Sequence, residues 1–548
     1  MYIKRITIQN FKCFNGRHVI EFSLPDSSKI GSGLNIFVGE NNSGKSTVFE
    51  AIDFLRDGTK KDLQLIKNKK SNENDEMIIE LLFKGKINDV IDNFAQNNKK
   101  EVFKKYMYEK EGVQYLGLSR SSLNSKVISL WDEKEKKYKN EAGIDAPLKK
   151  LFEANFVWAD TNPNEEMSFG STTICGNLLK EIVKKFEETD EFKTFSTLFN
   201  KTFNDENSRL KRDLKRIEEK TQNIFLEQFG KAKISFHFDE LKTEAFFKNT
   251  KIEIDDGTLT NMEEKGSGMQ RSVALALLQV YAEELIKHPD NSDINKPFFL
   301  FIDEPEICLH PQAQKKLFDA LHEISKLRQV FFTTHSPYFI KTEVLANVYH
   351  FENKEKITIL PTDENKTALI DVKKDFLNTD VCEIFFAKKV LCVEGKTDFK
   401  RFSIFFSGII HDFSDWSIIK MNNKEEAKKF WRLLKCFCSD FKIILDLDAI
   451  TGKRINKLGV ESETNTFRNF FSNDDIQNKI ISLGKKNRKE LLNINLTEEE
   501  IKTKNAILKL LKNEGVFVLQ QGEIEDYLDQ NGNLIDKGKK TELEEIFK

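Results

Sequence analysis

Three things are scarce in this sequence of 548 residues: cysteine, an excess of charge of either sign, and long apolar runs. The seven cysteines are odd in number and none is spaced as in a zinc finger, which favours reduced thiols over a disulfide framework. Cys436 and Cys438 form the one close pair in the sequence. Because apolar residues such as Phe437 surround them, we expect packing rather than metal binding.

The charges nearly cancel, with 86 basic and 88 acidic residues and a formal net charge of -2. Nucleic acid would therefore need a local basic patch, because the whole chain has no bias toward polyanions. No apolar run is long enough to cross a bilayer, and Met1–Arg5 lacks the apolar stretch of a signal peptide. We expect a cytoplasmic protein without a membrane partner, divided into roughly two to four domains.

The sequence does contain a phosphate-binding pattern. Gly39–Ser46 fits Gly-x-x-x-x-Gly-Lys-Ser, between the apolar run 34–38 and a stretch, 48–55, with apolar residues at helical spacing. Such a loop turns backbone N–H groups toward phosphates at the positive end of a helix. We expect Lys45 to meet the β and γ phosphates of ATP and Ser46 to hold Mg²⁺. The predicted nucleotide contacts are Asn41, Asn42, Ser43, Gly44, Lys45, Ser46 and Thr47.

Two further apolar runs end in polar residues suited to ATP hydrolysis. The run 298–302 ends in Asp303 and Glu304, as expected of a strand buried on both faces. We predict that Asp303 supports Mg²⁺ and that Glu304 polarises the attacking water. His335 follows the shorter run 330–332 and is predicted to donate to the γ phosphate.

Ser267 and Gly268 precede a predicted helix over 273–286. The start of that helix and the Ser267 hydroxyl are suited to gripping a phosphate, which makes both residues candidate nucleotide contacts. A flexible glycine turn is the alternative interpretation.

A second set of acids follows predicted strands in the C-terminal third. Glu394 follows the run 390–393, and Asp446 and Asp448 follow 443–445. Because side chains alternate along a strand, we expect Asp446 and Asp448 to point the same way. Carboxylates gathered at strand ends repel one another unless cations lie between them. We therefore predict a divalent metal site at these strand ends, with Glu525, which follows the apolar run 516–519, as the best additional ligand.

The first set of motifs resembles the SMC, RecF and ABC-type ATPases, and the second resembles the Toprim domain, with Glu394 and the Asp446/Asp448 pair at its signature positions. An ATPase of this type joined to a C-terminal Toprim unit is the arrangement of the OLD (overcoming lysogenization defect) family, which the sequence resembles over essentially its whole length. The resemblance implies an α/β fold: an ABC/RecF/SMC-like ATPase with a helical insertion, followed by a Toprim α/β domain. One departure is that Gly266 and Met269 replace a leucine and a glycine of the usual ABC segment.

Membership of that family implies an ATPase and a two-metal DNA endonuclease or nickase, often in antiphage defence. The resemblance implies that the metals are bound by Glu394, Asp398, Asp446, Asp448 and Glu525, with Mg²⁺ as the metal and Mn²⁺ or Ca²⁺ as alternatives. Glu394, Asp446 and Asp448 would then be the catalytic residues of phosphodiester cleavage, as Glu304 and His335 are predicted to be those of ATP hydrolysis. It also implies DNA as a partner, a homodimer or higher homo-oligomer, and a helicase-like or other defence protein as a candidate partner.

The resemblance leaves some residues unassigned. A C-terminal lysine assists catalysis in the family, and three lysines compete for that role: Lys537, Lys539 and Lys540. Two basic clusters are either contacts to the DNA backbone or solvated surface: Lys453, Arg454 and Lys457, and Lys485, Lys486, Arg488 and Lys489.

We predict an ATPase N-terminal part over 1–175, a helical insertion over 176–232, an ATPase C-terminal part over 233–375 and a Toprim domain over 376–548. We interpret the charged stretch of the insertion as a solvated helix face. The apolar stripe 178–186 is the alternative feature of interest, as a surface for a partner helix or for a second copy of the insertion. The alternative function is a non-nucleolytic RecF/SMC-type clamp or sensor that recruits a partner. A topoisomerase would need a DNA-gate domain with a nucleophilic tyrosine, which the sequence does not indicate.

Overall fold

The structure is a computed structural model. It describes the chain apart from residues 59–61, 150, 160–185, 204, 206–207, 230–250, 271, 275, 278–279, 281–296, 308, 354–356, 362–376, 379, 410–414, 439, 451–452, 456–460, 464–478, 481, 484–485, 487–488, 530–534, 536–541, 544–545 and 547–548. Its contacts divide the chain into two compact units. The first comprises Met1–Glu153, Lys296–Glu306 and Ser325–Lys548, and the second Ala154–Asn295 and Ile307–Ile324.

The first unit begins with an antiparallel sheet of seven strands in the order β2-β1-β4-β6-β7-β8, with β5 paired to β6. Buried and half-buried residues alternate along β4 from Ile78 to Phe83, as expected of a strand with one face on the core. The strands are β1 (Tyr2–Phe11), β2 (Phe14–Glu21), β4 (Ile78–Gly85), β5 (Tyr108–Lys110), β6 (Val113–Ser121), β7 (Ser129–Asp132) and β8 (Lys137–Asn140). Four short helices accompany them: α2 (Leu63–Ile66), α3 (Ile87–Phe94), α4 (Lys100–Tyr106) and α5 (Asp145–Lys149).

A second sheet of this unit carries strands in the order β15-β14-β3-β13-β12. The neighbours β14, β3, β13 and β12 are parallel, and β15 pairs antiparallel to β14. Every residue of β3, β12 and β13 is buried, which explains their continuous apolar runs. These strands are β3 (Leu34–Gly39), β12 (Phe298–Ile302), β13 (Gln329–Thr333), β14 (Val348–Asn353) and β15 (Ile357–Leu360).

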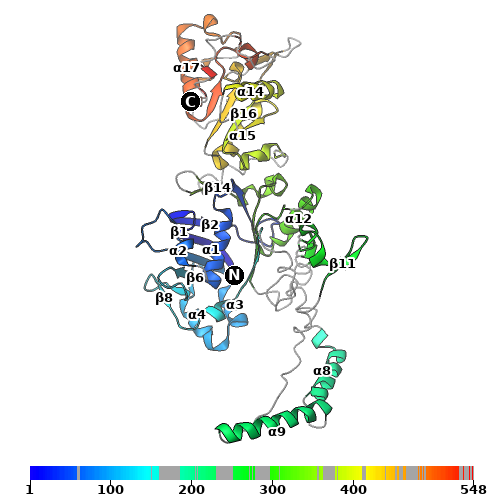
Figure 1. The fold of residues 1–548 in the computed structure, drawn as a ribbon. Coiled ribbons are helices and arrows are strands. Elements are labelled where there is room, and N and C mark those ends of the chain that lie inside the picture. The colour runs from blue at the N-terminus through cyan, green and yellow to red at the C-terminus, as the bar shows by residue number, and fades with distance from the viewer. Residues whose placement is uncertain are drawn as a thin grey trace. The chain divides into compact units, whose positions relative to one another are not determined.

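Helix α1 (Lys45–Asp57) is held against both sheets. Its Phe49 ring packs against Phe37 and Phe301 of the second sheet, at 5.5 Å and 5.4 Å between centroids. On the other side, the Arg120 guanidinium of β6 donates to the Leu55 carbonyl over 2.8 Å. The phosphate loop therefore opens into a helix fixed on two sides (Figure 1).

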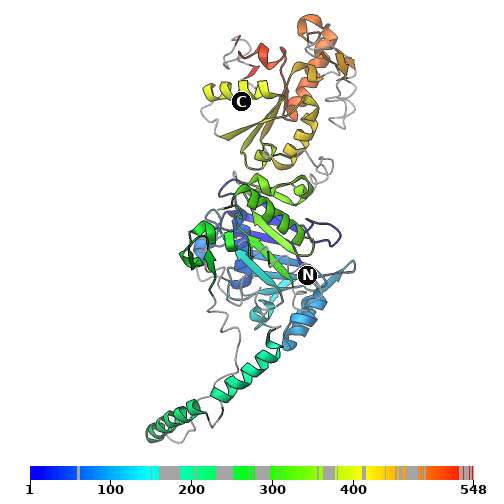
Figure 2. The ribbon, with the colours of Figure 1, turned by 90° about the vertical axis from the view of Figure 1, so that its right-hand side faces the viewer.

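The C-terminal part of the first unit contains a four-stranded parallel sheet in the order β17-β16-β18-β21. Figure 2 shows helices on both faces of this sheet. Its strands are β16 (Lys389–Val393), β17 (Trp416–Lys420), β18 (Phe441–Leu445) and β21 (Val516–Val518), and its helices are α14 (Lys396–Ile409), α15 (Ala427–Phe437) and α17 (Glu498–Asn513). A hairpin of β19 (Lys453–Ile455) and β20 (Glu461–Glu463) lies outside the sheet.

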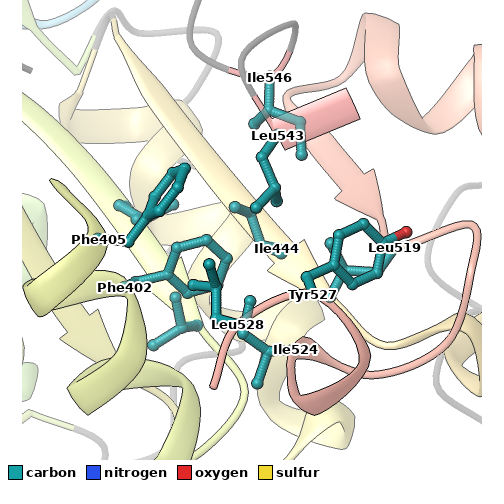
Figure 3. Packing of buried hydrophobic residues seen from close by; sticks show 11 residues of the cluster. Phe402, Phe405, Ile444, Leu519, Ile524, Tyr527, Leu528, Leu543 and Ile546 are labelled. Carbon is teal, nitrogen blue, oxygen red and sulfur yellow. The ribbon is translucent and has the colours of Figure 1, made fainter. Parts of the chain in front are cut away.

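One apolar cluster joins the elements of this C-terminal sheet (Figure 3). Phe402 and Phe405 of α14 meet Ile444 of β18, and Tyr527 packs among them with its ring fully buried. The cluster draws residues from 391 to 546 into one core, so the sheet depends on chain segments far apart in sequence.

The second unit contains β9 (Glu153–Val157), the helix α12 (Pro311–Ile324), the hairpin of β10 (Glu253–Asp255) and β11 (Leu259–Asn261), and the helices α8 (Asp190–Phe203) and α9 (Arg209–Phe229). Helices α8 and α9 contact each other and lie within the range where the sequence predicts a helical insertion. The apolar stripe at 178–183 lies outside the described residues. The four domain boundaries stay predictions.

Short 3-10 helices complete the described chain. They are η1 (Asn97–Lys99), η2 (Met262–Glu264), η3 (Pro337–Phe339), η4 (Thr342–Asn347), η6 (Val381–Phe385), η8 (Lys424–Glu426), η9 (Leu447–Ile450), η10 (Asn493–Asn495) and η11 (Ile524–Asp526). No helix of the described chain is both long and apolar enough to span a membrane.

Candidate active sites

The phosphate loop lies between the end of β3 and the start of α1. Gly39 and Gly44 have φ angles of 131° and 101°, and Asn42 has φ 61°, so the loop depends on left-handed backbone conformations. The Lys45 ammonium donates to the carbonyls of Gly39 and Glu40, over 3.0 Å and 2.7 Å. The Ser43 hydroxyl is buried and has no hydrogen-bond partner, as expected of a group placed for a ligand.

The neighbouring strands bring acidic and hydroxyl groups to the same edge. The Ser46 hydroxyl donates to Asp303 Oδ1 over 2.6 Å, and the Thr333 hydroxyl donates to the same oxygen over 2.7 Å. The structure thus brings Ser46 and Asp303, the two predicted Mg²⁺ ligands of this site, into direct contact. Thr333 was missed from the sequence, although its place at the end of the apolar strand β13 was a usable signal.

Glu304 and His335 face each other at this edge, with 3.9 Å between Glu304 Oε1 and His335 Nε2. Glu304 has a φ of 50°, which is rare for a residue with a Cβ, and its N–H donates to the Thr333 hydroxyl over 2.9 Å. His335 Nε2 is buried without a hydrogen-bond partner. Both side chains predicted to act on the γ phosphate therefore lie together beside Lys45.

Glu306 fixes the segment that carries His335 and was also missed from the sequence. Its carboxylate accepts the backbone N–H of His335 and, over 3.0 Å, the Thr334 hydroxyl. Burial raises the pKa of Glu306, although these hydrogen bonds oppose the shift. The repeated acid of Glu304-Pro305-Glu306 was the available signal.

Burial also sets the ionisation of the two basic groups at the nucleotide site. It lowers the pKa of Lys45 to about 8, while the carboxylates of Glu304 and Asp303 oppose the shift. It lowers the pKa of His335 to about 4, and the nearby Lys45 charge lowers it further. His335 is therefore a neutral donor near pH 7, while Lys45 still carries its charge.

Ser267 and Gly268 belong to the second unit, at the start of a helical turn. The Met269 and Gln270 N–H groups donate to the Gly266 carbonyl over 2.9 Å and 3.1 Å, so the segment is a helix start. Its predicted contact with a phosphate stays a prediction.

The second set of acids gathers at the carboxyl edge of the parallel sheet. Glu394 follows β16, Asp446 follows β18, Asp448 lies in η9 and Glu525 lies in η11 after β21. Asp398, in the first turn of α14, accepts the Gly395 N–H over 2.8 Å. The structure therefore brings the five predicted metal ligands to one edge.

The closeness of these carboxylates affects their pKa values. Burial raises the pKa of Asp446 well above its usual value, and the charges of Glu394, Asp398, Asp448 and Glu525 raise it further. Burial likewise raises the pKa of Glu394 to about 7, with Lys424 opposing and Asp448 adding to the shift. Such a set favours binding of a cation, because a cation relieves the repulsion.

The strand that was expected to carry Asp446 and Asp448 ends before both residues. Strand β18 ends at Leu445, and η9 begins at Leu447, so the alternation of side chains along a strand does not govern Asp446 and Asp448. Among the described residues, no group of three or more His, Cys, Asp or Glu side chains is already arranged to hold a metal ion. The donors fit a divalent cation in kind, since all are carboxylates and Glu394 Oε2 is buried without a hydrogen-bond partner.

Two cationic side chains at this edge were missed from the sequence. Lys424 Nζ lies 2.5 Å from Asp448 Oδ2, and Arg401 lies 3.9 Å from Glu525 Oε1. The signal for Lys424 was its place after a strand, but β17 was not recognised. The C-terminal lysines 537, 539 and 540 lie outside the described residues, as do Lys457, Lys485 and Arg488.

Family comparison identifies two domains in the chain. The family model described as an AAA ATPase domain matches residues 1–340, and that of the overcoming lysogenization defect protein-like TOPRIM domain matches residues 385–448. The chain belongs to the OLD family. It carries an AAA ATPase domain joined to a Toprim domain.

Three curated relatives of the OLD chain carry nuclease names. The Old nuclease of Escherichia phage P2 is 22% identical over 95% of this chain and 92% of its own length. The OLD nuclease of Thermus scotoductus is 26% identical over 41% of this chain and 43% of its own length. Endonuclease GajA of Bacillus cereus strain HuB5-5 is 22% identical over 49% of this chain and 40% of its own length, so the chain spans less than half of these last two relatives.

Proposed function

We propose that this OLD protein is an ATP-binding and hydrolysing, metal-dependent DNA endonuclease or nickase. The observation that carries the proposal is the set of carboxylates around Asp446, at the edge of the Toprim sheet. Burial and the charges of neighbouring carboxylates raise the pKa of both Asp446 and Glu394. A clamp or sensor without nuclease activity has no need for such a costly arrangement of buried acids.

At the nucleotide site, each residue has a role that its contacts support. The Lys45 ammonium and the loop N–H groups would bind the phosphates of ATP, and Ser46 with Asp303 would hold Mg²⁺. Glu304 would accept a hydrogen bond from the attacking water, and the neutral His335 would donate to the γ phosphate. Glu306 keeps His335 in position through its backbone N–H.

At the Toprim edge, divalent metal would supply charge neutralisation and a water activated for attack on phosphorus. Glu394, Asp398, Asp446, Asp448 and Glu525 are the proposed ligands, with Mg²⁺ as the metal and Mn²⁺ or Ca²⁺ as alternatives. Their oxygens are the donors that these hard cations prefer. Arg401 and Lys424 place positive charge where a DNA phosphate would approach.

The biological setting is part of the proposal. The names of the phage P2 and Bacillus cereus relatives support a nuclease. Antiphage defence is the setting that the resemblance to the OLD family implies. We propose that the protein acts in the cytoplasm as a homodimer or higher homo-oligomer, in which Ser267 and Gly268 of one subunit contact nucleotide held by another. A helicase-like or other defence protein is the proposed partner.

The deciding experiment incubates purified protein with supercoiled plasmid and Mg²⁺ or Mn²⁺, with and without ATP. We expect Asp446→Ala to lower nicking about a hundredfold or more, because charge stabilisation worth several kcal/mol is lost. Lys45→Ala should abolish ATP turnover. Asp415→Ala is the matched control, since Asp415 precedes β17 at the opposite edge of the same sheet and pairs with Lys388. Equal nicking by wild type and Asp446→Ala would contradict the proposal and favour the clamp.

A further inference from the structure

Lys424 is a deeply buried cation at the Toprim edge, with 2% of its side chain exposed. It begins η8, which follows β17, and the backbone N–H of Met421 donates to the Val393 carbonyl over 2.9 Å. The end of β17 is thereby fixed beside the end of β16, where Glu394 lies. Lysine is almost never fully buried unless its charge is paired.

The partner of Lys424 is a proposed metal ligand. Lys424 Nζ lies 2.5 Å from Asp448 Oδ2, and only 18% of the Asp448 side chain is exposed. Lys424 also acts on Glu394, where its charge opposes the effect of burial on the pKa of that carboxyl. One ammonium therefore interacts with two of the five acids.

The acids differ in how they are satisfied. Glu394 Oε2 is buried without a hydrogen-bond partner, whereas Asp448 already has a cation against its carboxylate. This difference explains why the acids of the described part of the edge lie close together without forming a metal site. Five carboxylates converge there, yet no three are arranged to hold an ion, and an ammonium lies against one of them.

We propose that Lys424 is a positioning residue of the nuclease site: its ammonium is a tethered counter-ion that holds Asp448 before metal arrives and competes with a divalent cation for that carboxylate. Lys424 thereby limits how tightly the edge binds metal and keeps the metal-free protein folded. This inference rests on the proposed metal-dependent function.

An ordinary structural ion pair makes the opposite prediction for metal binding. If Lys424 only supports the fold, its removal loosens Asp448 and leaves Mn²⁺ affinity unchanged or weaker. If Lys424 competes with metal, its removal strengthens Mn²⁺ binding, because a positive charge leaves the immediate surroundings of two ligands. The two accounts therefore differ in the sign of one measurable quantity.

The test titrates Mn²⁺ into nucleotide-free, full-length protein by calorimetry, counting only the binding that Asp446→Ala abolishes. We expect Lys424→Met to bind Mn²⁺ at least about tenfold more tightly than wild type, the size of a one-unit shift from a single nearby charge. Lys424→Arg keeps the charge and should bind like wild type. Lys435→Met is the matched control. Lys435 lies on α15, and its ammonium is 2.8 Å from the carboxylate of Glu514, which is not one of the five acids.

Thermal unfolding supplies an independent readout. Without metal, Lys424→Met should melt below wild type, because it removes the ammonium that lies against the largely buried carboxylate of Asp448. Saturating Mn²⁺ should then raise the Tm of Lys424→Met by more than it raises that of wild type. In an Asp448→Asn background, Lys424→Met should no longer strengthen Mn²⁺ binding, since the shared carboxylate is gone.

The outcomes separate the two claims. If Lys424→Met binds Mn²⁺ no more tightly than wild type, the proposal that Lys424 competes with metal is wrong, while the nuclease proposal stands. If wild type shows no Mn²⁺ binding that depends on Asp446, the proposed function itself fails. Should Lys424→Met not fold, Lys424→Gln keeps a hydrogen bond to Asp448 without the charge and carries the same expectation of tighter binding.

Discussion

At the scale of single residues, Glu304 has a rare backbone conformation, and its carboxylate is the group that we propose accepts a hydrogen bond from the attacking water. Its φ of 50° costs of order 1 kcal/mol or more in a residue with a Cβ. The backbone N–H of Glu304 donates a hydrogen bond to the Thr333 hydroxyl, which stabilises this conformation. The same hydroxyl donates to Asp303. The strain therefore lies where the chain must direct a carboxylate toward the phosphate loop.

This arrangement predicts that Glu304→Gln separates ATP binding from ATP hydrolysis. The amide has nearly the same shape but is a far weaker acceptor for the attacking water, so turnover should fall about a hundredfold or more. Binding of a fluorescent ATP analogue should stay within about threefold of wild type. Glu343→Gln, on η4, is the control and should hydrolyse ATP normally. Normal turnover by Glu304→Gln would remove Glu304 from the mechanism.

His335 predicts a pH dependence of stability. Its pKa of about 4 lies below the ordinary value of 6.5, so between these values the unfolded chain binds a proton that the folded protein does not. Its contribution to stability is therefore full above about pH 6.5 and is lost as the pH falls toward 4. We expect His335→Gln to reduce the drop in Tm between pH 7.5 and pH 5 by about 1 to 3 °C. His18→Gln, on β2, should retain the wild-type drop, and an equal drop in all three proteins would contradict the assignment.

At the scale of elements, the junction of β3 and the phosphate loop has no room for a side chain. A Cβ on Gly39 would lie 2.3 Å from the Phe351 carbonyl oxygen of β14, and the φ of Gly39 is 131°. Gly39→Ala should therefore separate β3 from β14, with a loss of more than about 3 kcal/mol and of ATP binding.

Gly112 provides the control for that prediction. It also has a positive φ, 72°, but a Cβ there would meet nothing within 4 Å. Gly112→Ala should cost only about 1 kcal/mol and leave ATP binding intact. Chemical denaturation and nucleotide titration of both variants provide the comparison. Equal effects of the two substitutions would show that φ alone matters, not the approach of β14.

Elements buried on both faces were predictable from the sequence, since strands such as β12 and β16 are continuous apolar runs that end in acids. Strand β17 was missed, because Ser417 and Lys420 interrupt its apolar residues. The role of Lys424 was missed with it, because its burial depends on Asp448, a partner distant in sequence. A 3-10 helix carries Asp448 in place of the expected strand, so the common direction of Asp446 and Asp448 stays a prediction.

At the scale of the whole molecule, self-association is the property with the clearest test. Helices α8 and α9 expose apolar side chains, among them Phe195, Leu198 and Ile217. If a second copy covers them, Leu198→Glu with Ile217→Glu should lower the dimer fraction at least about tenfold, as measured by light scattering after gel filtration. Lys193→Glu, on the same helix, is the control for charge. An unchanged mass would assign these helices to solvent or to another partner.

The two active centres also differ in how much of the chain each one needs. The groups around ATP, from Lys45 to His335, precede the Toprim acids, which extend from Glu394 to Glu525. During synthesis the ribosome must release Glu525 before the cutting centre can assemble, whereas the ATPase groups emerge far earlier. A nascent chain therefore acquires its ATPase groups first, and the proposed nuclease centre can assemble only after Glu525 has emerged.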